Sequence, residues 1–180
     1  MHVNDLHWLS EAEHAPSAHC DTRPQGEISG LVLHSISLPP GEFGGKAITD
    51  LFLGRLDPEA HPYFKKIKGL RVSAHCLIRR SGQVIQYVGF DQRAWHAGKS
   101  CWQGRSRLND FTVGVELEGD HRPFTRAQYA CLVELTRALM GKYSALTPER
   151  ITGHQHVAPL RKVDPGPSFD WQYFFQRLRG

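Results

Sequence analysis

The sequence predicts a single α/β domain in which a mixed β-sheet is flanked by helices. Short apolar or alternating runs typical of strands are interleaved along the chain with segments of helical spacing. The length of 180 residues fits one domain and is enough to bury a core without disulfide bonds. We expect residues 1–29 to be an irregular lead-in and residues 30–180 to form the domain.

The first strand is predicted at residues 30–37, a short apolar run that ends in polar side chains. Residues 38–45 are rich in Pro and Gly and are predicted to form a loop. Apolar side chains then keep helical spacing over residues 47–56, and Asp57-Pro58 ends this helix. A shorter helical turn is expected within residues 61–67.

A hairpin is predicted next, because residues 72–79 and 84–88 flank the turn signal Ser81-Gly82. Residues 111–118 follow with an alternation of period two, which indicates a strand with two different faces. Glu116 and Glu118 lie on one face of it. The apolar residues of the other face are Phe111, Val113, Val115 and Leu117.

The clearest helix is predicted over residues 126–140, where apolar side chains recur at helical spacing. Thr125 and Gln128 form a capping-box pattern at its start, and Gly141 is expected to end it. Residues 151–153 then form a short strand leading into His154. After a long Pro/Gly-containing loop, Asp170 is expected to cap a terminal amphipathic helix over residues 171–178.

Charge and hydropathy exclude two classes of partner. The net charge of +4 is mild and scattered, whereas a nucleic-acid surface needs clustered basic residues. The short run at residues 65–68 is expected to be a solvated face. No stretch approaches the roughly 20 apolar residues of a membrane span. We therefore expect neither nucleic acid nor membrane as a partner.

The amino terminus lacks a basic segment followed by an apolar run, so no secretory signal is expected. Four widely spaced cysteines form no CxxC pair and are predicted to be free thiols: Cys20, Cys76, Cys101 and Cys131. Both observations favour a cytoplasmic location.

Two of the eleven histidines and one aspartate are the candidate metal ligands. His34 lies at the end of one predicted strand, His154 directly follows another, and Asp164 lies in a constrained loop ten residues after His154. Two imidazoles and one carboxylate would give Zn²⁺ three ligands and leave a position open for water, as in catalytic sites. Spacing alone does not select this set, because each residue also fits an ordinary polar position at a strand end or turn.

A family resemblance adds weight to this set. Blocks spread over about residues 30–171 resemble, in order, the AmpD-type cytoplasmic anhydro-muramyl-peptide amidases, whose superfamily includes peptidoglycan-recognition proteins and phage-type amidases. The blocks are residues 31–34, 37–41, 43–44, 72–75, 94–98 (Ala-Trp-His-Ala-Gly), 113–118 (Val-Gly-Val-Glu-Leu-Glu), 153–154, 161–162 and 164–167 (Asp-Pro-Gly-Pro).

The resemblance implies a zinc amidase, with its metal in a groove at one sheet edge, that cleaves the amide between the lactyl group of muramic acid and L-alanine. His34, His154 and Asp164 match the family's zinc ligands. Glu116 matches its catalytic glutamate, a suitable group to move a proton from water to the leaving nitrogen. Lys162 matches a lysine beside the metal, where it would stabilise an oxyanion.

Substrate contacts are also implied. Trp95 is expected to stack on a sugar, and Arg71 and Arg107 to bind stem-peptide carboxylates; packing for Trp95 and structural ion pairs for the arginines are the alternatives. Ser35 stands where the family commonly has Asn and is expected to contact the peptide. Two further departures, at His156 and Leu160, put fine specificity rather than chemistry in doubt.

The remaining histidines receive lesser roles. His75 and His96 are expected to support the site or to pack in the core, and His61, His121 and the N-terminal histidines to lie at the surface.

We thus expect a monomeric Zn²⁺ enzyme that acts on anhydro-muropeptides during cytoplasmic recycling of the cell wall. Two alternatives stay open: a periplasmic or phage-derived amidase of polymeric peptidoglycan, and a muropeptide-binding module without catalysis. The second would have no need of an open metal site or of Glu116.

Overall fold

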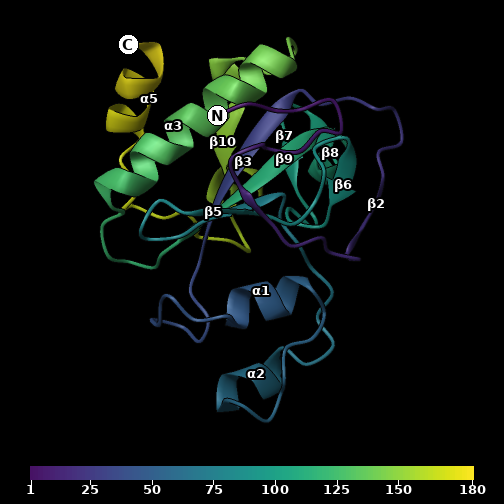
Figure 1. Ribbon diagram of the computed structural model, residues 1–180, viewed down its shortest axis with the longest axis vertical. Coiled ribbons are helices and arrows are strands. Elements are labelled where there is room, and N and C mark those ends of the chain that lie inside the picture. Colours follow the sequence, from purple (N-terminus) through teal and green to yellow (C-terminus); the bar gives the residue numbers. More distant parts are fainter.

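The computed structural model describes residues 1–180 and is built on a six-stranded mixed sheet in the order β1-β5-β4-β9-β3-β10 (Figure 1). The strands are β1 (Glu13–His14), β3 (Gly30–Ile36), β4 (Cys76–Ile78), β5 (Val84–Gln86), β9 (Thr112–Glu118) and β10 (Ile151–Gly153). β3 and β9 are the longest and run parallel to each other, and β4 and β5 form the predicted antiparallel hairpin. The predicted α/β fold with its helix-flanked mixed sheet is confirmed.

Two helices cover one face of the sheet, α3 (Arg126–Lys142) and α5 (Trp171–Arg179) (Figure 1). The main core lies between them and the sheet, and it includes the odd-numbered residues Val113, Val115 and Leu117 of β9 together with Leu31 and Leu33 of β3. Alternation along the strands therefore sends the intervening residues to the opposite face.

That opposite face carries two smaller apolar clusters. One packs α1 (Ala47–Phe52) and α2 (Pro62–Lys66), which lie together at the lower end of Figure 1, against β4 and β5. The other surrounds Val32 of β3 and Val157 of the short helix α4 (His154–Val157). His34 and Glu116, two of the predicted site residues, lie on this face of the sheet.

The remaining elements are short. Two small antiparallel sheets pair β2 (Cys20–Thr22) with β6 (Gln92–Ala94) and β7 (Cys101–Trp102) with β8 (Arg105–Ser106). Two 3-10 turns are η1 (Leu108–Asp110) and η2 (Pro148–Arg150). The segment before Gly30, predicted to be irregular, thus contains β1 and β2, because strands of two or three residues leave no readable period.

Local capping signals are confirmed at α3 and α5. Thr125 and Gln128 form a reciprocal capping box, and the Asp170 side chain accepts from the Tyr173 N–H. The expected stop at Gly141 is wrong, because α3 continues through it to Lys142. The first helix is shorter than predicted: it ends at Phe52, and Gly54 follows with a φ of +71°, a left-handed conformation that breaks helical geometry.

Phe111 also departs from its predicted face. It packs with Val32 and Val157 rather than with Val113 and Val115. It belongs to the end of η1, with φ −136° and ψ 4°, so strand alternation does not apply to it.

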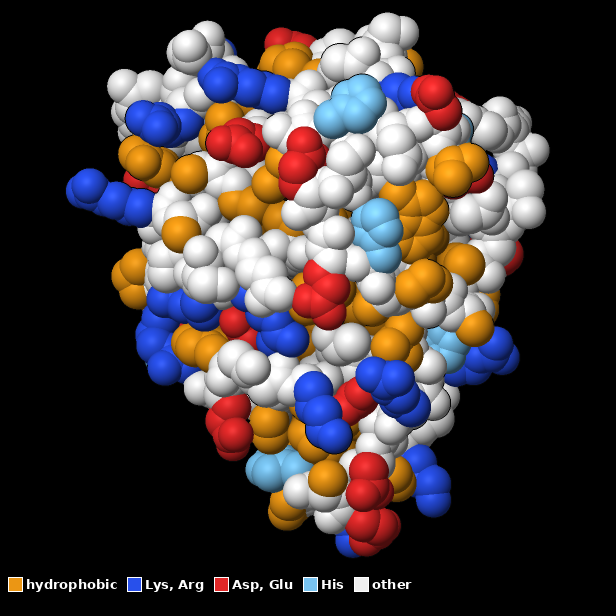
Figure 2. Space-filling model, viewed as in Figure 1, with side chains coloured by type: hydrophobic (Ala, Val, Ile, Leu, Met, Phe, Trp, Pro, Cys, Tyr) orange, Lys and Arg blue, Asp and Glu red, His pale blue; other side chains and the backbone are white.

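None of the helices combines the length and the apolar composition that a membrane span requires. On the face shown in Figure 2, Lys and Arg side chains lie among Asp and Glu and form no continuous basic field. The four cysteines are free.

Candidate metal centre

Three ligand atoms from distant parts of the chain converge at the end of β3. His34 lies near the end of β3, and His154 begins α4 directly after β10; because Gly153 pairs with Leu33 in parallel register, the two histidines are neighbours. Their Nδ1 atoms are 2.9 Å apart, and Asp164 Oδ2 lies 3.1 Å from each. The predicted set of three is therefore brought together.

The geometry and chemistry of this donor set fit a zinc ion. Tetrahedral ligands at about 2.0–2.1 Å from Zn²⁺ lie about 3.3–3.4 Å from one another, and the observed separations are only slightly smaller. The second ring nitrogen of His154, Nε2, lies 3.2 Å from the Ala97 carbonyl oxygen, which can only accept. His154 therefore carries its proton on Nε2 and directs the lone pair of Nδ1 at the other two ligand atoms.

The buried surroundings of this centre favour the protonation states that bind a cation. Desolvation lowers the pKa of His34 to about 4, although Asp164 opposes the shift, so the imidazole is neutral near pH 7. Burial acts to raise the pKa of Asp164, but the neighbouring histidines outweigh it and the pKa lies below its usual value. A neutral imidazole and an ionised carboxylate are the forms that bind metal.

Glu116 stands beside the three ligands. It pairs with His34 in the parallel register of β3 and β9, so its side chain projects from the same face of the sheet. Its Oε2 atom is buried without a hydrogen-bond partner. Desolvation and the charge of Asp164 raise the pKa of Glu116 well above its ordinary value, and Lys162 partly opposes them.

These residues line one cavity of about 400 Å³ beside the apolar cluster that α1 and α2 form with β4 and β5. Seven of the predicted site residues face it: His34, Ser35, Trp95, Glu116, His154, Lys162 and Asp164. Leu38, Phe52 and Tyr63 supply apolar walls from the α1–α2 side. The cavity thus combines a cation site, an unpartnered carboxylate and an ammonium group.

Lys162 reaches the cavity from the loop between His154 and Asp164. The backbone N–H groups of Arg161 and Lys162 both donate to the Ala158 carbonyl, at 2.9 Å each. The Arg161 guanidinium fixes the loop further by donating to the carbonyls of Ala97 (2.8 Å) and Lys99 (2.9 Å). The lysine is therefore held by a turn rather than by the sheet.

The two predicted substrate arginines lie outside this cavity lining. Arg71 is exposed, with its guanidinium 5.4 Å from the ring centroid of Trp95, so it borders the cavity through that ring. Arg107 lines a separate hollow beside β8, and its Nε lies 3.1 Å from Asp110 Oδ2. Its part in substrate binding stays a prediction.

Several histidines have structural positions that the sequence did not distinguish. His19, expected at the surface, is buried because its ring stacks on Trp95 at 5.9 Å and its Nδ1 lies 3.1 Å from the Val72 carbonyl oxygen. His75 is fully buried, with Nδ1 accepting from the Gly114 N–H at 2.9 Å. His96 contacts the metal centre directly, since its Nδ1 is 3.0 Å from His34 Nε2.

Comparisons with known proteins agree with this geometry. A family model described as N-acetylmuramoyl-L-alanine amidase matches residues 22–167. The chain is 57% identical over 173 residues to the 1,6-anhydro-N-acetylmuramyl-L-alanine amidase AmpD of Enterobacter cloacae, covering 95% of this chain and 92% of that protein.

Two solved amidase structures resemble this chain in fold. A crystal structure of a selenomethionine AmpD derivative superposes with a TM-score of 0.94 at 57% identity, covering 97% of this chain and 98% of that one. The amidase AmiD of Escherichia coli, in complex with anhydro-N-acetylmuramic acid-L-Ala-D-γ-Glu-L-Lys, superposes with a TM-score of 0.61 at 29% identity, covering 83% of this chain and 57% of that one.

Proposed function

Since this chain belongs to the N-acetylmuramoyl-L-alanine amidase family and is an amidase of its AmpD type, we propose that it hydrolyses the lactyl–L-alanine amide of 1,6-anhydro-N-acetylmuramyl peptides with one zinc ion held by His34, His154 and Asp164. Residues 30–180 hold the catalytic residues in this proposal, and residues 1–29 complete the same domain by adding β1 and β2.

The observation that carries the proposal is the unpartnered Oε2 of Glu116 beside three convergent metal-ligand atoms. A buried carboxylate oxygen without a partner is costly unless a ligand or water completes it. A binding module gains nothing from a buried carboxylate without a partner, whereas a hydrolase needs a base next to its nucleophile. Catalysis therefore explains Glu116 better than binding alone.

In the reaction, a water in the cavity beside Glu116 attacks the carbon of the substrate carbonyl. Zinc in this site would supply Lewis acidity to the carbonyl and lower the pKa of a water to about 7. Glu116 accepts a proton from the attacking water at Oε2 as the oxygen–carbon bond forms. It then gives that proton to the L-alanine nitrogen as the carbon–nitrogen bond breaks, which releases the peptide as an amine.

Lys162 and the cavity walls support this step. The ammonium group of Lys162 faces the cavity, where it stabilises the negative charge that develops on the carbonyl oxygen. Trp95 offers an aromatic surface to the sugar, with Arg71 beside it for a carboxylate of the stem peptide. Ser35 contacts the peptide from the end of β3.

A cytoplasmic setting and a soluble substrate complete the proposal. Four free cysteines are typical of a reducing compartment, and cell-wall recycling supplies anhydro-muropeptides there. We propose a monomer with neither nucleic acid nor membrane as a partner.

Incubation with anhydro-muramyl-tripeptide, and separately with intact peptidoglycan, tests this assignment by mass spectrometry of released peptide. We expect rapid release from the soluble substrate, loss of release with a chelator, and recovery on adding Zn²⁺. Release from intact peptidoglycan alone would assign the chain to wall degradation, and no release from either would contradict the proposal.

A further inference from the structure

We propose that the segment His96-Ala97, held in place by the side chain of Asn109, sets the tautomers of both metal-binding histidines. This inference rests on the metal centre proposed above and assigns a positioning role to residues outside the ligand set. His96 and Ala97 are consecutive, yet each contacts a different ligand histidine. The hydrogen bond made by one ring nitrogen of a histidine decides where the proton sits, and so which nitrogen is free to bind metal.

Ala97 sets His154. Its carbonyl oxygen lies 3.2 Å from His154 Nε2 and also accepts from the Arg161 guanidinium at 2.8 Å. A carbonyl oxygen only accepts, so the neutral His154 ring must carry its proton on Nε2. The lone pair of His154 then lies on Nδ1, the atom that faces His34 and Asp164.

His96 fixes the tautomer of His34 through a directional chain of hydrogen bonds. The Thr112 hydroxyl donates to the Leu108 carbonyl at 2.7 Å, so its oxygen is left to accept from His96 Nε2 at 3.4 Å. With its proton on Nε2, neutral His96 presents a lone pair on Nδ1, 3.0 Å from His34 Nε2. His34 Nε2 must therefore donate, which leaves its own Nδ1 free for metal.

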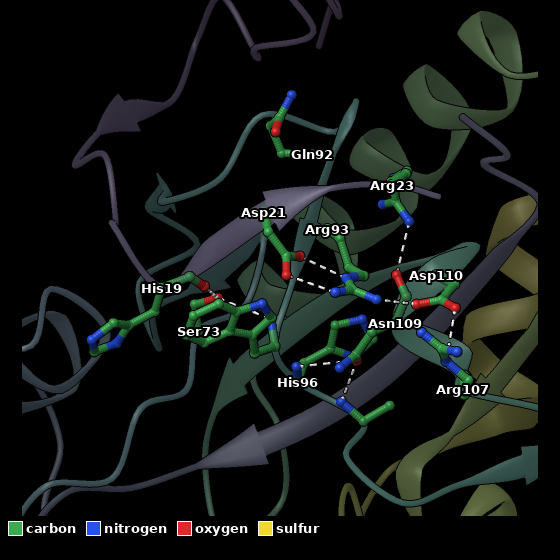
Figure 3. Close-up of polar contacts among 12 residues, drawn as sticks. His19, Asp21, Arg23, Ser73, Gln92, Arg93, His96, Arg107, Asn109 and Asp110 are labelled. Atoms are coloured by element: carbon green, nitrogen blue, oxygen red, sulfur yellow. Dashed lines mark hydrogen bonds and ion pairs between the residues drawn. The ribbon is translucent and has the colours of Figure 1, made fainter. Parts of the chain in front are cut away.

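Asn109 fixes the segment that does this. Its Oδ1 accepts from the backbone N–H groups of both His96 (3.2 Å) and Ala97 (2.8 Å). Figure 3 shows Asn109 beside His96. Its own backbone carbonyl accepts from the buried Arg23 guanidinium at 3.0 Å. One amide oxygen thus orients the peptide units that carry the two histidine partners.

The sheet also leaves space for the His96 ring. A Cβ on Gly114 of β9 would lie 2.3 Å from His96 Cγ, far inside contact distance, so the ring packs directly on the strand backbone. Glycine at this position leaves the space that the ring occupies. The ring is therefore fixed by packing below it and by hydrogen bonds at both nitrogens.

The consequence is a centre arranged for a cation before one binds. With both rings protonated at Nε2, the two Nδ1 lone pairs and the Asp164 carboxylate converge on one point. Loss of such outer partners typically weakens metal binding about 10–100-fold. Loss of the orienting segment should have this effect without removing a ligand.

Competition with a chromophoric chelator measures the zinc affinity of the full chain and of two matched pairs of variants. Asn109→Leu removes the acceptor, whereas Asn109→Asp keeps an oxygen at its position. His96→Gln places its amide where Nε2 was, whereas His96→Asn places an oxygen near Nδ1, within reach of His34. We expect about 10–100-fold weaker zinc binding for the first of each pair and a change of less than about threefold for the second.

Long-range ¹H–¹⁵N spectra of the histidine rings supply the second readout. In the parent and in the conservative variants, His34 and His154 should both be protonated at Nε2. Asn109→Leu and His96→Gln should show mixed tautomers. Equal zinc affinity across a matched pair, or parent-like tautomers in the weakened variants, would overturn the positioning role. If the parent chain itself binds no zinc, the proposed function fails instead.

Discussion

His34 and Glu116 occupy paired positions on the neighbouring parallel strands β3 and β9, and both side chains line the same cavity. The proposed metal ligand and the proposed proton-transfer group are thereby fixed side by side on the most extended pairing of the sheet. Neither depends on a mobile loop for its position.

As the pH falls, the amidase should lose activity at a pH above the ordinary glutamate range. Glu116 acts as the base only when ionised, and burial raises its pKa, so it takes up a proton at higher pH than an exposed glutamate. The profile of kcat/KM against pH, with metal content checked at each point, measures this. Full activity down to about pH 4, near the ordinary glutamate value, would show that Glu116 is not the base.

Replacement of Lys162 by Met should lower kcat about 10²–10³-fold, the usual effect of removing one oxyanion donor. Lys162 lines the cavity but is not among the three metal-ligand residues, so bound zinc should stay close to one ion per chain. Steady-state kinetics and metal analysis on the same preparation separate the two effects. A rise in KM with kcat unchanged would place Lys162 in substrate binding alone.

Glu118→Ala should destabilise the fold by about 3–5 kcal/mol, because it leaves a largely buried arginine without its partner. The Glu118 side chain is 2% exposed, pairs with Arg79 at 2.9 Å and accepts from the Gly44 N–H at 2.7 Å. Urea denaturation measures the change in the free energy of unfolding. Glu59→Ala is the control: its pair with Lys65 is exposed, so a loss below about 1 kcal/mol is expected.

Gly114→Ala should both destabilise the fold and weaken zinc binding, because the added Cβ meets the His96 ring at 2.3 Å. Overpacking of this kind costs about 1–3 kcal/mol. Gly141→Ala is the matched control, since nothing lies within 4 Å of its Cβ position inside α3. It should stabilise the protein by about 0.5–1 kcal/mol. Zinc binding unchanged in Gly114→Ala would argue that His96 does not support the centre.

Elements with strong local signals were predictable from the sequence. The alternation in β9 placed Glu116 opposite Val113 and Val115, and the Thr125–Gln128 pair marked the start of α3. Gly141 failed as a stop because a glycine ends a helix only when its backbone turns left-handed, and here it does not. The short strands β1 and β2 exist only through pairing with β5 and β6, which no local pattern records.

The site was predictable only in part for the same reason. His34 and His154 are 120 residues apart, so family resemblance rather than spacing joined them. The contact between His34 and His96 spans 62 residues and depends on a missing side chain at Gly114. The role of Asn109 left no trace in the sequence, because it acts through backbone N–H groups that any residue supplies.

Zinc content and peptide release, measured together on the parent chain and on Glu116→Gln, test the proposed mechanism most directly. We predict one zinc per chain in both proteins, with release from anhydro-muramyl-tripeptide falling about 10²–10⁴-fold in the variant. That result would separate the metal centre from the proton-transfer group beside it. Parent-like release by Glu116→Gln, or undiminished release by a parent chain stripped of metal, would contradict the account.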